Sequence, residues 1–305
     1  MPIVHNLSAV TLPAFQDNRA DDPISEFALR VVVELEGWRL YVVGTATLIC
    51  GNLAITARHV LDHILRTYGT QSKSSANAGI DEFEIDYELK LYQVLPGPVY
   101  RIWRVYTVWT CATDIALLHL GLDRATSPDE TIIWKQPRLR VLPPPVGQTV
   151  VAFGYREAKI NVTEDNDGVH HIELNDRPTT SIGTVRQVYP RGRDPVMLPF
   201  PCYEIEARFD PGMSGGMVID QTGKLCGLVC ASLQHDDPHA PPISYVTSLW
   251  PMLKTVISAD RGGDRYPKGV SYPVIDLAID GVIGVEDLHA LDPRHFPDKQ
   301  LTSHR

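Results

Sequence analysis

The chain has 305 residues, of which 44% are hydrophobic and 21% charged, which is the composition of a globular protein with a sizeable core. Its net charge of -9, together with the lack of a long basic run, argues against nucleic acid or an anionic membrane as partner. No stretch approaches the roughly 18 apolar residues that span a bilayer. The N-terminus lacks the pattern of a secretory signal, so we expect a cytoplasmic protein.

The cysteines do not form the even, regularly spaced set that is typical of a disulfide framework. There are five of them: Cys50, Cys111, Cys202, Cys226 and Cys230. Cys226 and Cys230 lie in one β-like run, where four residues span about 13 Å, too far for a bridge. The sequence therefore predicts buried thiols in a reducing compartment.

The chain begins with a mixed segment, residues 1–23, which we interpret as an arm. A valine-rich stretch at 27–35 and further apolar stretches at 38–43, 45–50 and 53–57 predict strands, with Gly37, Gly44 and Gly51 in the turns between them. Leu61, Ile64 and Leu65 then recur at helical spacing. His59 is thus placed where a strand leads into a short helix.

His59 also has an alternative interpretation as a metal ligand. His59 and His63 are four residues apart and would share one helix face, as zinc ligands do. The metalloprotease pattern requires Glu directly after the first His, and Val60 stands there instead. Zinc is therefore the less favoured interpretation.

The middle of the chain predicts two more strands and contains one carboxylate, Asp114, that is a candidate functional residue. Residues 69–80 are polar and loop-like, 83–95 and 99–109 are rich in β-formers, and 121–145 resemble a linker. Asp114 directly precedes the apolar run 115–120. It is interpreted either as a cap at the start of a strand or as a carboxylate that accepts a hydrogen bond from an imidazole.

The second half has the same character as the first, with many short strands. Residues 146–155 predict a strand, and an acidic, polar excursion follows at 156–169. Further strands are predicted at 171–174, 180–188, 203–209, 217–219, 225–231 and 243–250, and a short helix at 249–258.

A glycine-rich turn carries Ser214. Gly212 stands two residues before the serine, and Gly215 and Gly216 follow it directly. Glycine is used where backbone turns sharply or approaches a ligand closely. Such a turn can present a nucleophilic hydroxyl and aim backbone N–H groups at one point, as acyl transfer requires. The alternative is an ordinary glycine-rich hairpin.

Three motifs, around His59, Asp114 and Ser214, occur in this order at separations of 55 and 100 residues. With them, residues 25–258 resemble the trypsin-like (chymotrypsin-fold) serine peptidases. The resemblance implies an all-β fold of two antiparallel six-stranded barrels, with the active site in the crevice between them. It divides the chain into an arm (1–23), a peptidase domain (24–258, with barrels near 24–125 and 146–248) and a tail (259–305) that follows a short C-terminal helix.

The same resemblance implies a mechanism. Ser214 would attack a peptide carbonyl, His59 would take its proton, and Asp114 would orient the imidazole. The N–H groups of Gly212 and Ser214 would form the oxyanion hole. We therefore expect a serine endopeptidase acting through an acyl-enzyme on proteins or peptides, without a required cofactor, in an intracellular regulatory or effector role.

Two departures from the family pattern matter. Met213 replaces the aspartate of zymogen-activated relatives, so no activation by a freed N-terminal amine is expected, as in bacterial HtrA-type and viral relatives. Cys230 replaces a serine that commonly donates to the triad aspartate. Both departures motivate the alternative of a catalytically silent trypsin-fold binding or scaffold protein.

The substrate pocket is less determined. Counting without gaps places Arg208 at its floor, but neighbouring residues of a strand point to opposite faces, so Phe209 is the alternative and the one we favour. A cleavage preference for Arg or Lys is not expected, because no carboxylate stands there. The expected walls are Val229, Cys230, Ala231 and Ser232.

The tail contains a partial calcium-loop pattern at 276–288. Asp276, Asp280 and Asp287 fall at ligand positions 1, 5 and 12, but Ala278 at position 3 cannot bind a cation. A surface turn is the favoured interpretation, and weak calcium binding is the alternative. The tail is otherwise expected to dock onto a regulatory protein partner or onto the peptidase body.

Overall fold

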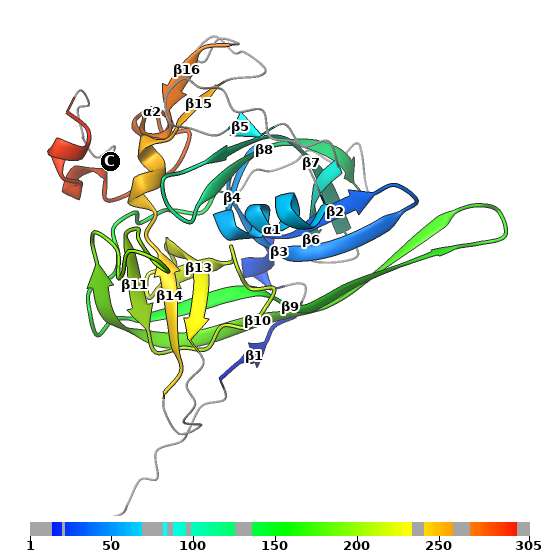
Figure 1. Ribbon diagram of the computed structural model, residues 1–305, viewed down its shortest axis with the longest axis horizontal. Helices are drawn as coiled ribbons and strands as arrows, with labels where there is room; N and C mark the ends of the chain where they lie inside the picture. Colours follow the sequence, from blue (N-terminus) through cyan, green and yellow to red (C-terminus); the bar gives the residue numbers. More distant parts are fainter. Residues whose placement is uncertain are drawn as a thin grey trace, which may run out of the picture.

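Two β-barrels packed against each other make up most of the computed structural model (Figure 1). The structure describes residues 14–19, 22–68, 82–83, 88–95, 99–125, 136–233, 241–258 and 269–297. The predicted loop at 69–80, and parts of the predicted arm, linker and tail, lie outside the described residues.

The first barrel is a closed ring of six antiparallel strands. They are β2 (Ala28–Leu35), β3 (Arg39–Cys50), β4 (Leu53–Thr56), β6 (Glu88–Leu95), β7 (Val99–Thr110) and β8 (Ala116–Ala125). Pairing follows the order β7-β6-β2-β3-β4-β8, the pairing of β7 with β8 closes the ring, and the short β5 (Glu82–Phe83) adds to β7. The predicted stretches 38–43 and 45–50 form one strand, because Gly44 lies at a register shift in the β2–β3 ladder rather than in a turn.

The second barrel is closed in the same way. Its strands are β9 (Thr149–Glu164), β10 (His170–Tyr189), β11 (Cys202–Ile205), β12 (Met217–Asp220), β13 (Leu225–Leu233) and β14 (Ile243–Thr247). The order is β10-β11-β14-β13-β12-β9, with β10 pairing back to β9, and β1 (Gln16–Asp17) adds to the outside of β10. Two six-stranded barrels, as the sequence predicts, are therefore confirmed.

The hairpin β9–β10 is longer than predicted, and it reaches along the first barrel (Figure 1). The prediction of a polar excursion at 156–169 was wrong, because Ile160 and Val162 alternate with polar residues and face an apolar patch. That patch belongs to the first barrel and consists of Val32, Leu40, Tyr92 and Ile102. The hairpin thus ties the two barrels together. The predicted linker also begins too early, because β8 continues to Ala125 in its ladder with β7.

The helical elements are short. They are η1 (Pro23–Glu26), α1 (Arg58–Tyr68), η2 (Trp250–Lys254), α2 (Val274–Ile279), η3 (Leu288–Ala290) and η4 (Pro293–His295). The predicted helix at 249–258 is only partly right, because β15 (Val256–Ser258) pairs with β16 (Ser271–Pro273). β-Branched Val256 and Ile257 favour this strand.

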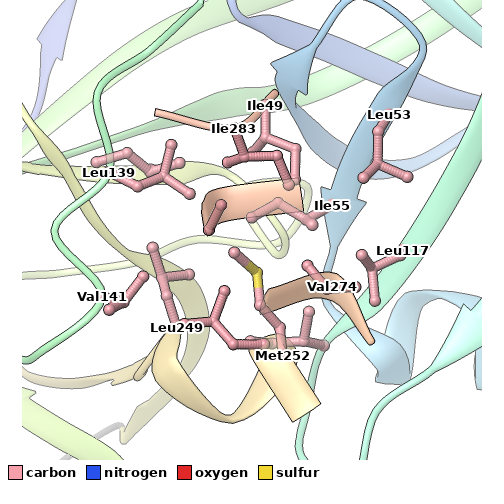
Figure 2. Packing of buried hydrophobic residues seen from close by; sticks show 14 of the residues in the cluster. Ile49, Leu53, Ile55, Leu117, Leu139, Val141, Leu249, Met252, Val274 and Ile283 are labelled. Atoms are coloured by element: carbon pink, nitrogen blue, oxygen red, sulfur yellow. The ribbon is translucent and has the colours of Figure 1, made fainter. Parts of the chain in front are cut away.

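A large core joins both barrels to the tail. Figure 2 shows Ile55 and Leu117 of the first barrel, Leu139 from the segment between the barrels, and Met252 and Val274 from the C-terminal segment converging on one centre. All five of these side chains are buried. The tail therefore packs onto the body of the molecule.

None of the described helices is long and apolar enough to cross a membrane.

All five cysteines are buried and free.

Candidate active site

His59 and Asp114 form a two-point contact at one end of the first barrel. Pairing of Thr56 with Ala116 between β4 and β8 brings the start of α1 beside the start of β8. His59 Nδ1 lies 2.8 Å from Asp114 Oδ2, and the His59 backbone N–H donates to Asp114 Oδ1 at 2.9 Å. Asp114 is 7% exposed, whereas the His59 side chain is 44% exposed. A buried carboxylate thus orients an accessible imidazole.

The electrostatic surroundings favour a basic His59. Burial by itself lowers the pKa of His59, but the hydrogen bond to Asp114 and the charges of Asp114 and Asp62 outweigh it and raise the pKa above its ordinary value. Because Nδ1 faces Asp114, the opposite ring nitrogen, Nε2, is directed away from that carboxylate. Such a group can accept a proton from a hydroxyl and then hold it.

The Ser214 turn belongs to the second barrel but packs against the first. The Thr45 N–H donates to the Ser214 carbonyl at 2.9 Å. A Cβ on Gly215, whose φ is +80°, would lie 2.2 Å from the Thr45 carbonyl oxygen and 2.8 Å from the Ala57 nitrogen. Only glycine permits this approach. The turn therefore lies against the strands that lead into His59.

Ser214 Oγ makes no hydrogen bond to His59 within the described residues. In substrate-free enzymes this contact is often long and shortens only when substrate binds. The structure therefore places the serine turn next to the segment that carries His59, without a hydrogen bond between the two side chains.

Gly212 sets the direction of the N–H groups near Ser214. Its φ is +94°, and a Cβ there would lie 2.4 Å from the Tyr155 carbonyl oxygen. Thr45 Oγ1 donates to the Gly212 carbonyl at 2.8 Å, which turns this oxygen toward the first barrel. Within the described part of the chain, neither the Gly212 nor the Ser214 N–H has a protein acceptor.

A groove of ≈ 510 Å³ opens in front of the His–Asp pair. Its walls include Asp62 and Ala231 and the loop of residues 196–200. In that loop, Val196 is 81% and Met197 69% exposed, an unusual exposure for large apolar side chains. Sequence reasoning missed this loop, although an apolar run between Pro195 and Pro199 is a signal that could have found it.

The two alternatives for the pocket floor differ clearly in burial. Phe209 is 6% exposed and belongs to the core of the second barrel. Arg208 lies on the surface, where its Nε donates to Asp210 at 2.8 Å. The phenylalanine therefore points inward and the arginine outward.

The predicted wall residues follow β13 away from the serine turn. Val229 is buried in the second-barrel core, and its backbone pairs with Gly215 and Gly216. Cys230 and Ala231 line the groove. Ser232 Oγ accepts from Ser244 Oγ at 3.0 Å. Residues 234–240, which follow this strand, lie outside the described residues.

Cys230 lies beside the His–Asp pair. One potential ligand atom each from His59, Asp114 and Cys230 lie within 4.8 Å of one another, and among the described residues no other such cluster of three occurs. Burial, and then the charge of Asp114, raises the pKa of the Cys230 thiol well above its ordinary value. Both Asp114 oxygens in this cluster are bonded to His59. His63 does not join it.

The three aspartates of the calcium-loop pattern do not gather into such a cluster within the described residues. Asp276 lies in α2, and Asp280 follows its last turn. Both carboxylate oxygens of Asp287 accept backbone N–H groups, from Val141 and from Leu142, each at 2.9 Å. Asp287 fastens the segment between the barrels to the tail, and calcium binding stays a prediction.

Comparisons with known proteins complete these observations. A sequence model of the trypsin-like peptidase domain matches residues 44–228, more than half of the chain. Among solved structures, the active form of the Rv3671c protease from M. tuberculosis is 15% identical, with 79% of this chain and 88% of that chain covered and a TM-score of 0.43. The MamO protease domain from Magnetospirillum magneticum is 16% identical, with 74% and 93% covered and a TM-score of 0.43. No curated protein matches.

Proposed function

We propose, from the premise that this chain belongs to the trypsin-like peptidase family and is a serine peptidase, that it is an endopeptidase whose catalytic residues are His59, Asp114 and Ser214. The observation that carries the proposal is the two-point contact in which both oxygens of a buried Asp114 hold His59. A single hydrogen bond between these residues would be an ordinary ion pair. The second bond, to the His59 backbone N–H, fixes the carboxylate in the plane where it orients Nδ1–H.

The reaction proceeds in two halves. Ser214 Oγ attacks the peptide carbonyl while His59 Nε2 takes the hydroxyl proton, and the tetrahedral intermediate collapses to an acyl-enzyme as that proton passes to the leaving amine. Water then attacks the acyl-enzyme, with His59 acting again as base, and the acid product leaves. The Asp114 carboxylate stabilises the imidazolium in both halves.

The N–H groups of Gly212 and Ser214 stabilise the oxyanion. Their lack of a protein acceptor in the described chain supports this role, because buried or half-buried amides normally find a partner. Removing one donor of an oxyanion hole typically costs about 3 kcal/mol of transition-state stabilisation. Residues of the second barrel thus supply the charge stabilisation, and those of the first supply the base.

The substrate is a protein or peptide with apolar residues near the cleaved bond. Phe209 is buried in the second-barrel core and Arg208 lies on the surface, so neither predicted floor position offers a carboxylate, and the exposed Val196 and Met197 border the groove. Five buried thiols are consistent with an intracellular regulatory or effector protease.

Fluorophosphonate labelling of the full chain tests the catalytic serine. We expect wild type to be labelled, Ser214→Ala to lose all labelling and at least about 10⁴-fold of its peptidase activity, and Ser25→Ala to behave as wild type. Ser25 is the control because it lies on η1, outside the groove lining, and its hydroxyl donates to the Asp22 carbonyl. Unlabelled wild type would support a silent scaffold. A peptide library then reads the preference, and cleavage after Arg or Lys would contradict the apolar pocket.

A further inference from the structure

The turn that carries Ser214 lacks the aspartate that ion-pairs with a free amine in many relatives, so another device must hold it. Met213, at that position, is fully buried among apolar residues of the second barrel. The carboxylate nearest in sequence is Asp210, and its backbone carbonyl accepts the Met213 N–H at 3.2 Å. What fixes Asp210 therefore fixes the start of the turn.

Two arginines from different segments hold Asp210. Arg156 Nη2 lies 2.9 Å from Asp210 Oδ2, and Arg208 Nε lies 2.8 Å from Asp210 Oδ1. Glu157 is a further neighbour of Arg156, at 3.6 Å, but it is largely exposed, whereas Arg156 and Asp210 are 13% and 16% exposed. The pair Arg156–Asp210 is thus the less screened interaction.

Both guanidinium groups lie over the ring of Phe15, which belongs to the N-terminal segment, residues 14–19. The carbon at the centre of the Arg156 guanidinium is 3.8 Å from the Phe15 ring centroid, and that of Arg208 is 5.3 Å away. These are cation–π distances, and the attraction grows when the cation is desolvated. Phe15 also packs against the second-barrel core, which contains Phe209 and Met213.

The N-terminal segment is held to the barrel mainly through its backbone. Gln16 pairs with Thr180 and Asp17 with Thr179 of β10. Ser181 Oγ donates to the Ala14 carbonyl at 3.1 Å, and the Asn18 N–H donates to the Pro178 carbonyl at 2.7 Å. The edge of β10 therefore sets the position of Phe15, largely independently of the side chains beside it.

We propose that Phe15 is a positioning residue for catalysis: its ring holds Arg156 and Arg208 on Asp210 and so keeps the Gly212–Ser214 turn in its oxyanion-binding conformation. The expected effect of Phe15 on the catalytic rate rests on the proposed function. Its expected effect on the conformation of the Gly212–Ser214 turn does not. Docking of the N-terminal segment is then coupled to the active site, because undocking it releases both arginines from the same ring.

The contacts also separate this role from simple packing. Leucine in place of Phe15 would keep much of the apolar contact with the barrel but would offer the arginines no π face, whereas tyrosine would keep both. Gln16 is the matched control, because it is exposed and pairs through its backbone, so Gln16→Ala leaves the docked segment and the ring in place.

The experiment uses the full chain with Phe15→Ala, Phe15→Leu, Phe15→Tyr and Gln16→Ala. We measure kcat and KM on one peptide, and amide hydrogen exchange by mass spectrometry over residues 209–217. Phe15→Ala and Phe15→Leu should lower kcat by about tenfold with KM nearly unchanged and should speed exchange in this segment. Phe15→Tyr and Gln16→Ala should match wild type in both measurements.

A coupling test completes the design. If the ring acts through Asp210, the double variant Phe15→Ala/Asp210→Asn should differ little from Asp210→Asn alone. Its kcat should be only slightly lower, and its amide exchange only slightly faster, than in that single variant. Phe15→Leu equal to wild type in both readouts would overturn the proposal and leave Phe15 a packing residue. If wild type proves inactive, the proposed function fails, but the hydrogen-exchange measurement still tests whether Phe15 holds the turn. Faster exchange in Phe15→Ala would support this role of Phe15, and unchanged exchange would overturn it.

Discussion

The two halves of the active site are built by different means. The half on the first barrel, His59 and Asp114, is held by direct bonds between its own members, next to a rigid strand pair. The half on the second barrel is a turn, held by the backbone conformations of Gly212 and Gly215 and by the ion pairs of Asp210. In the proposed mechanism, side-chain hydrogen bonds position the base, and backbone conformation positions the nucleophile and its oxyanion donors.

This difference means that the two halves should fail in different ways. A substitution in the first half can remove function while the fold remains, since it alters a charge in a preserved site. A substitution at Gly212 or Gly215 in the second half changes the conformation of the backbone, so it should affect stability and activity together. The predictions below separate these behaviours.

The largest effect is expected from Asp114→Asn in the first half. The amide oxygen can still accept the His59 backbone N–H, so the melting temperature should change little. The charge that orients and stabilises the imidazolium is lost, and kcat should fall by about 10⁴-fold. Steady-state kinetics and thermal melting on the same sample check both parts. A large loss of stability would show that Asp114 is chiefly structural.

Gly212→Ala should have the next largest effect, in the second half. Its Cβ would lie 2.4 Å from the Tyr155 carbonyl oxygen at a φ of +94°, so the turn must move. We expect kcat to fall by roughly 10²–10³-fold, as for loss of an oxyanion donor, with a lowered melting temperature. Gly223→Ala is the control, because Gly223 also has a positive φ, +77°, but no atom within 4 Å of its Cβ. Equal kinetic losses in both variants would contradict the assigned role of Gly212.

Asp62→Asn should have the smallest effect, and only on pH dependence. The charge of Asp62 contributes to the raised pKa of His59, and catalysis requires the neutral imidazole. Removing the charge lowers that pKa, so the acid limb of kcat/KM should move to lower pH. Activity on the acid side should rise while the plateau stays unchanged. A limb that does not move, or that moves to higher pH, would contradict this assignment.

The sequence predicts the fold well, because the fold depends on local patterns. Alternating apolar residues identify the barrel strands, and the motifs around His59, Asp114 and Ser214 mark the ends of such strands. Of Arg208 and Phe209, the sequence favours Phe209 as the inward residue but does not exclude Arg208, since successive residues of a strand point to opposite faces. The structure has Phe209 inward.

Other features escaped the sequence because they depend on contacts between distant segments. The hairpin β9–β10 reads as a polar loop until its Ile160 and Val162 are seen against the first barrel. The stacking of Phe15 on Arg156 joins segments far apart in the chain, and no spacing rule predicts it. The hydrogen bond from the Val141 N–H to Asp287 likewise joins distant segments, and no sequence pattern predicts it.

The reach of the β9–β10 hairpin has a consequence for synthesis on the ribosome. The patch formed by Val32, Leu40, Tyr92 and Ile102 is covered in part by Ile160 and Val162, which emerge long after the first barrel is complete. Domains generally fold as they emerge, and apolar surface left bare in the meantime attracts chaperones or aggregates. Part of the apolar surface of the first barrel therefore stays uncovered during synthesis until the β9–β10 hairpin has emerged.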